Sequence, residues 1–174
     1  MKAMDRGRWL EPIAILAFFA VCQFGPAHAQ QPAPQQLTTA ASSGLATVAS
    51  NHTVSDTIER FEAAVRANGW VVFARLDHAA AAQAAGLQLR PRTVVVFGNP
   101  RGGTPAMRTN PTLAIDLPLK ALVWEDDGGK VWLTYNSAEF VGEHVYGRHG
   151  LKLGPEPIQG LVTLLDAVVQ QASR

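Results

Sequence analysis

From about residue 45 onward, apolar and polar positions change repeatedly between a helical and a strand spacing. Ile58, Phe61 and Val65 lie three and four residues apart, which places them on one face of a helix. The predicted strands are 45–50 at a sheet edge, 70–76, 92–97, and a hairpin of 119–125 and 130–135. The predicted helices are 55–67, 78–85, two short turns within 105–115, 137–146 and 158–171.

Residue types at the helix ends predict where several of these helices begin. Asp77 is expected to cap the helix that follows it. In the same way, Ser55 and Ser137 are expected to cap the helices that they open. Thr104-Pro105 is expected to start a helix, because a threonine cap followed by proline suits the first helical position. Asn110-Pro111 has the same combination of a capping residue and proline and is expected to start a second short helix.

The pattern also predicts how some side chains face. Glu62 and Arg66 are four residues apart and are expected to pair on the outer side of their helix. The strand 92–97 is almost entirely β-branched, as is typical of a strand buried on both faces. In the hairpin, Leu122 and Trp124 are expected to share a face with Leu133.

Taken together, the elements predict an α+β domain. Strands and helices are mixed along the chain, and the hairpin favours antiparallel pairing. We expect a single sheet of about five strands with helices packed mainly on one face, a two-layer arrangement. The apolar stripe of the last helix, which begins at Ile158, must be covered by the sheet or by another subunit.

Composition narrows the functional classes. The chain has 174 residues, of which 47% are hydrophobic and 17% charged, so it is neither collagen-like nor mainly disordered. Its 15 basic and 14 acidic residues give no basic bias that would point to nucleic acid.

Residues 1–29 are predicted to be a cleavable signal peptide. A basic start is followed by the apolar stretch 13–22 and then by Ala27-His28-Ala29, the small-x-small pattern before a cleavage site. A membrane anchor is the alternative, but the stretch is shorter than the roughly 20 residues needed to span a bilayer. Cleavage near Ala29 predicts a bacterial periplasmic or secreted protein.

Cleavage changes what the remaining chain can do. It removes Cys22, the single cysteine, so the exported protein would have no disulfide, thiol nucleophile or cysteine metal ligand. Residues 30–44 are uncharged and rich in Gln, Pro, Ala and Ser, which predicts a flexible linker before a domain at 45–174. The mature chain is formally neutral, and no second apolar run is long enough to span a membrane.

Short motifs in a fixed order connect this domain to a known family. They are Thr57-Ile58-Glu59, Gly69-Trp70, Asp77-His78, Gly86-Leu87, Phe97-Gly98-Asn99-Pro100, Thr104-Pro105-Ala106-Met107, Ala114-Ile115-Asp116-Leu117-Pro118-Leu119, Gly129-Lys130-Val131-Trp132 and Tyr135-Asn136. With these motifs the chain resembles the family called domain of unknown function 302, from about Thr53 to Leu151. The resemblance implies a compact α+β domain that forms homodimers, and it supplies no catalytic residues.

The glycine-rich segment 98–105 is the best candidate ligand site. It follows a buried strand and precedes a helix, where free backbone N–H groups can bind an anion. The alternative is a tight connection that uses glycine's conformational freedom. The expected contacts to a small anionic ligand are Gly98, Asn99, Arg101, Gly102, Gly103, Thr104 and Arg108.

Two weaker candidates concern chemistry. Asp77, His78 and Asp116 would make a hydrolase-type acid–base set if they converged, although helix capping explains Asp77 as well. His144 and His149 would bind a metal or haem, but their spacing matches no common metal motif. We therefore predict no cofactor, and a dimeric, non-catalytic protein that binds a small ligand or a partner.

Overall fold

The computed structural model describes residues 43–174. The predicted signal peptide and nearly all of the predicted linker lie outside the described residues. The elements, in order, are β1 (Leu45–Ser50), α1 (Val54–Ala67), β2 (Val71–Asp77), α2 (His78–Ala84), β3 (Arg92–Gly98), α3 (Pro100–Thr109), η1 (Pro111–Ile115), β4 (Leu119–Glu125), β5 (Val131–Asn136), α4 (Ala138–Phe140), η2 (Val141–Tyr146), η3 (Gly147–His149) and α5 (Pro155–Ser173).

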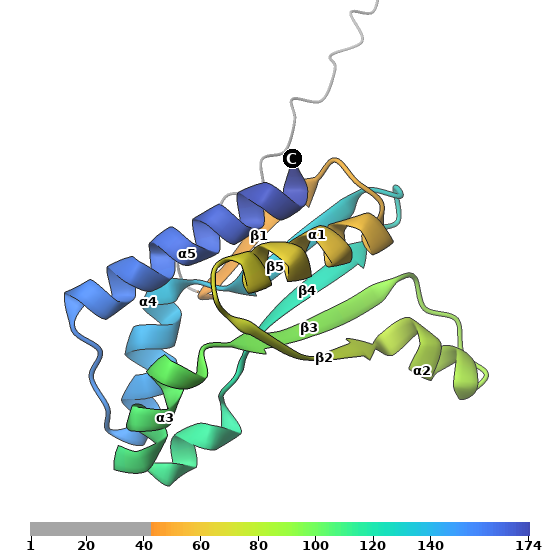
Figure 1. Ribbon diagram of the computed structural model, residues 1–174. Helices are drawn as coiled ribbons and strands as arrows, with labels where there is room; N and C mark the ends of the chain where they lie inside the picture. The colour runs from red at the N-terminus through yellow and green to blue at the C-terminus, as the bar shows by residue number, and fades with distance from the viewer. Residues whose placement is uncertain (1–42) are drawn as a thin grey trace, which may run out of the picture. The chain divides into compact units, whose positions relative to one another are not determined.

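The five strands form one antiparallel sheet in the order β1-β5-β4-β3-β2. Helices α1 and α5 lie side by side over one face of this sheet (Figure 1). Between the two layers is the hydrophobic core, whose fully buried members include Phe61, Val65, Phe97, Leu133 and Val168. The predicted two-layer α+β class is confirmed.

Among the helices of residues 43–174, none forms a layer along the centre of the second face of the sheet. On β3, buried residues alternate with half-buried ones, so the prediction that this strand is buried on both faces is wrong. Trp124 pairs with Trp132 on this open face, and their rings stack with centroids 6.2 Å apart. The Trp124 indole N–H donates to Thr134 at 3.0 Å, which satisfies the polar end of the side chain without a covering layer.

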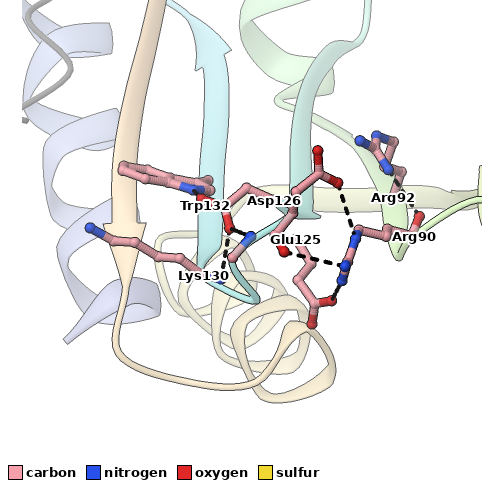
Figure 2. Close-up of polar contacts among 8 residues, drawn as sticks. Arg90, Arg92, Glu125, Asp126, Lys130 and Trp132 are labelled. Carbon is pink, nitrogen blue, oxygen red and sulfur yellow. Dashed lines mark hydrogen bonds and ion pairs between the residues drawn. The ribbon is translucent and has the colours of Figure 1, made fainter.

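In the β4–β5 hairpin, the side chains on the buried face of the sheet are not those that the sequence predicted. Val123, and not Leu122 or Trp124, shares the buried face with Leu133. The cause is the turn, in which the Asp126 carboxylate accepts the backbone N–H groups of Gly128 and Lys130, each at 2.9 Å (Figure 2). Strand β5 therefore begins after Lys130, and residues 121, 123, 133 and 135 face the core.

Helix α1 corrects two further predictions. Its cap is Thr53, whose hydroxyl accepts the Asp56 N–H at 3.1 Å, and not Ser55. Glu62 does pair with Arg66, at 2.8 Å, but Glu62 is only 4% exposed. The predicted outer position of Glu62 is wrong because Arg75 of β2 approaches the same carboxylate from the sheet.

Residues 71–89 form an exposed segment that we call the β2–α2 arm. Helix α2, which Asp77 caps as predicted, has no buried residue, and it lies beyond the end of the helical layer (Figure 1). Phe73, Leu76 and Leu87 are 53%, 49% and 63% exposed. The arm therefore carries a group of large apolar side chains in contact with solvent. Within the described part of the chain, no helix is long and apolar enough to cross a bilayer.

Candidate functional site

The segment after β3 folds differently from the loop that its glycines suggest. The Asn99 side chain accepts the Arg101 N–H at 3.0 Å, and Pro100 is the first residue of α3. The prediction of a helix start at Thr104-Pro105 is wrong, because Asn99-Pro100 provides the same cap and proline five residues earlier. Pro105 lies inside the helix.

This early start removes the basis of the predicted anion site. The backbone N–H groups of Gly102 and Gly103 donate to the Asn99 carbonyl at 3.1 and 2.9 Å, so they are not free as expected. Arg101 and Arg108 are exposed on α3 and do not line the cavity described below. The amides and the two guanidinium groups therefore do not converge on one point.

A cavity of about 550 Å³ lies where β3 ends, which is a volume typical of small-molecule sites. It is lined by the start of β2, the end of β3, the start of β4, and helices α3, η2 and α5. The lining residues are Trp70, Phe73, Gly98, Asn99, Pro100, Gly102, Gly103, Thr104, Met107, Leu117, Pro118, Leu119, Val141, Tyr146, Leu153, Pro157, Gly160 and Leu161.

Among residues 43–174, the lining is apolar and includes no Asp, Glu, Lys, Arg or His. Five of the predicted ligand residues do line it: Gly98, Asn99, Gly102, Gly103 and Thr104. The aromatic and aliphatic members were missed, because Trp70, Leu117 and Leu161 have the sequence pattern of ordinary core residues. A cavity with these walls suits an apolar molecule better than an anion.

Tyr146 contributes a polar group to this apolar wall. It ends η2, a π-helical turn of the kind that often occurs at functional sites. Burial raises the pKa of the Tyr146 phenol above its usual value, so the hydroxyl stays protonated. No sequence motif placed Tyr146 beside the glycine-rich segment 98–105.

Gly160, a residue of α5, also lines the cavity. A Cβ built at Gly160 would meet no atom within 4 Å, so this position has room for a side chain. Trp70 lies on the side of the core, where its ring is 6.1 Å from that of Phe97. Residues next to the core and residues of α5 therefore both contribute to the wall.

The predicted acid–base residues do not come together. Asp77 pairs with Thr93 at one end of β3, whereas Leu119, just after the Asp116 segment, pairs with Phe97 near the other end. Four residues of strand separate these positions by about 13 Å. Asp77 caps α2 through a bond from the Ala80 N–H at 3.0 Å, and His78 is exposed.

Asp116 instead belongs to a set of polar side chains that we call the His149 cluster: Asn110, Thr112, Asp116, Arg148 and His149. His149 Nε2 lies 2.7 Å from an Asp116 carboxylate oxygen, and His149 Nδ1 lies 2.7 Å from the Thr112 hydroxyl. Asn110 donates to the His149 carbonyl at 2.6 Å and accepts from the Thr112 hydroxyl at 2.7 Å. Arg148 pairs with Asp116 at 3.1 Å. The cluster joins η1 to η3.

The hydrogen bonds of His149 limit what this cluster can do. Nδ1 is bonded to the Thr112 hydroxyl and Nε2 to the Asp116 carboxylate. Neither ring nitrogen is free to take a proton from a substrate. The arrangement therefore fits a structural connection better than a nucleophile and base.

The remaining candidates are also dispersed. His144 stacks on Phe140 with ring centroids 4.8 Å apart, away from the bonds of His149. Among residues 43–174, no group of three or more potential ligands from His, Cys, Asp and Glu is placed to hold a metal. Arg90 pairs with Glu125 and Asp127 at the hairpin end of the sheet (Figure 2), far along the strands from the cavity.

This two-layer α+β domain, with its cavity at the end of the third strand, defines a class of small domains built on one antiparallel sheet. Residues 46–171 match the family model described as domain of unknown function DUF302, so the chain belongs to the DUF302 family. The crystal structure of an uncharacterized conserved DUF302 protein from Bacillus stearothermophilus has the same fold, with a TM-score of 0.62 at 20% identity. That likeness covers 76% of this chain and 99% of the other.

Curated relatives include two proteins named fluoride-specific ion channel FluC 1, from Brucella suis biovar 1 and Brucella abortus biovar 1. Each is 44% identical to this chain over 132 residues, which is 75% of this chain and 50% or 47% of the relative. The chain thus spans about half the length of the curated relatives that it matches.

Proposed function

We propose that this chain is an exported, dimeric, non-catalytic domain that binds a small apolar molecule in the cavity beside α3. The observation that carries the proposal is the cavity itself, with a volume of about 550 Å³ and a lining free of charged side chains. A space of this size and polarity favours a small organic ligand, because its apolar surface leaves water on binding.

The arrangement of polar residues supports a binding function over catalysis. Asp77 and Asp116 lie near opposite ends of β3, and the ring of His149 is occupied at both nitrogens. A general base must reach the proton that it abstracts, and these groups are either apart or already engaged.

The name of the Brucella relatives describes whole proteins about twice as long as the matched region. The cavity has no cationic side chain in its lining and would be a poor site for a small anion such as fluoride. We therefore base the proposed ligand class on the cavity and do not extend the channel activity to this chain.

Two other parts of the proposal rest on different features. The signal-peptide pattern of residues 1–29 supports export to the periplasm or beyond. The exposed apolar side chains of the β2–α2 arm, on a strand with one free edge, support association with a second copy.

Filling the cavity tests the binding function. Gly160→Phe should place a ring at the α5 wall of the cavity and lower the affinity for the uncharged dye Nile red at least about tenfold, because the ring takes up part of the site. Gln159→Phe adds the same ring at the neighbouring exposed position, outside the lining, and is the matched control. Fluorescence titration measures both. Equal binding by the two variants would show that the dye does not use the cavity.

A further inference from the structure

We infer that the cavity takes an uncharged amphipathic molecule, with one polar group that hydrogen-bonds to the Tyr146 hydroxyl and an apolar body along the aromatic and aliphatic wall. This inference rests on the proposed function and specifies the ligand class of the same cavity. It departs from the small anion that the glycine-rich segment suggests.

The charge of the ligand follows from the walls. No described lining residue carries a charge; Arg101 and Arg148 do not line the cavity, and Arg148 is paired with Asp116. A carboxylate or ammonium group that entered this space would lose hydration without gaining an opposite charge. The free-energy cost of removing water from a hydroxyl, ketone or ester group is far smaller than for a charged group.

The polar group of the ligand follows from Tyr146. Within residues 43–174, the Tyr146 hydroxyl has no hydrogen-bond partner, although the side chain is half-buried and lines the cavity. Because this hydroxyl is not among the fully buried atoms that lack a partner, it is open to a polar group of a ligand that enters the cavity. Because the phenol stays protonated, it can donate to a carbonyl and can both donate to and accept from an alcohol.

The rest of the cavity accommodates an apolar body. Met107 and Leu117 approach the Gly103 position of α3, since a Cβ there would lie 3.8 and 3.5 Å from their terminal carbons. Trp70 stands at the inner side and Leu161 at the α5 side. Methionine and leucine side chains adapt to irregular apolar shapes, which suits a flexible or small-ring body.

Displacement of Nile red from the purified full-length protein tests the ligand class with three probes at pH 8: 1-octanol, octanoate and propylbenzene. We expect 1-octanol to compete at least about tenfold better than octanoate, because the carboxylate has no partner in the lining. Tyr146→Phe keeps the ring and removes the hydroxyl. It should weaken 1-octanol roughly two- to tenfold and leave propylbenzene unchanged.

Tyr135→Phe is the matched control, because Tyr135 is buried in the core and does not line the cavity; it should change neither probe. Octanoate competing as well as 1-octanol, or Tyr146→Phe leaving 1-octanol unchanged, would overturn the ligand class. If the ligand class fails in this way but Gly160→Phe still abolishes dye binding, the proposed binding function of the cavity stands. Absence of dye and octanol binding to the native protein would overturn both.

Discussion

Glu62 shows how a single residue departs from its helical pattern. The four-residue spacing of Glu62 and Arg66 predicts that the two side chains pair. In the structure the Glu62 carboxylate is also bonded to Arg75, thirteen residues away, so it is buried between two guanidinium groups. The hydrogen bond from Arg75 is the main cause that lowers the pKa of Glu62 from its ordinary value of 4.5. The burial is set by β2 folding back against α1, so helix spacing alone could not reveal it.

We expect Glu62→Gln to lower the free energy of unfolding at pH 7 by about 1–2 kcal/mol, since charged hydrogen bonds are lost while the arginines remain half-exposed. Because folding lowers the pKa of Glu62, its stabilisation is present above pH 4.5 and disappears as the pH falls through the lowered pKa. Urea unfolding at pH 7 and pH 3 should show the difference between the variants shrinking in acid.

Glu59→Gln is the control for this prediction, at an exposed position of the same helix, and should change stability little at either pH. A Glu62→Gln deficit that stayed constant from pH 7 to pH 3 would contradict an ionic origin.

At the scale of elements, the His149 cluster connects η1 to η3 through hydrogen bonds and an ion pair. Asn110 has a double role, since it caps η1 through the Thr112 N–H at 3.0 Å and reaches the His149 carbonyl. We expect Asn110→Ala to cost about 1–2 kcal/mol and to speed amide exchange in η3, measured by urea unfolding and hydrogen exchange.

Asn99→Ala provides the comparison, because Asn99 caps α3 without a hydrogen bond to a distant segment. It should cost less and leave exchange in η3 unchanged. Equal exchange profiles for the two variants would refute the connecting role of Asn110.

The start of an element could be predicted where the sequence offers a single capping or strand pattern. Asp77 and Asn110 cap their helices as expected, and residues 119–125 form the first strand of the hairpin. The start of α3 was missed because the cap-and-proline signal occurs twice, and local sequence does not decide between Asn99-Pro100 and Thr104-Pro105. The facing of the hairpin depended on where β5 begins, which side-chain bonds of the turn determine.

At the scale of the molecule, the layers were more predictable than the cavity. The apolar stripe of each helix and the alternation in each strand indicate which face of the element must be buried. Burying these faces together predicts one sheet with helices packed on one side. The cavity is assembled from separate stretches of the chain, at 70–73, 98–107, 117–119, 141–146 and 153–161, and most of its walls are residues such as Leu117 and Leu161. A residue that lines a cavity and one that fills the core have the same local pattern.

The β2–α2 arm is predicted to form the interface between two copies of the chain. Leu76→Glu combined with Leu87→Glu places charges among the exposed apolar side chains, so we expect at least about a tenfold weaker dimer by analytical ultracentrifugation. The circular dichroism spectrum should not change, because α2 has no buried residue. Ile115→Glu, at a position that is 76% exposed outside the arm, should leave the dimer intact. A native protein that sediments as a monomer at high concentration, or a double variant that remains dimeric, would show that the arm does not form this interface.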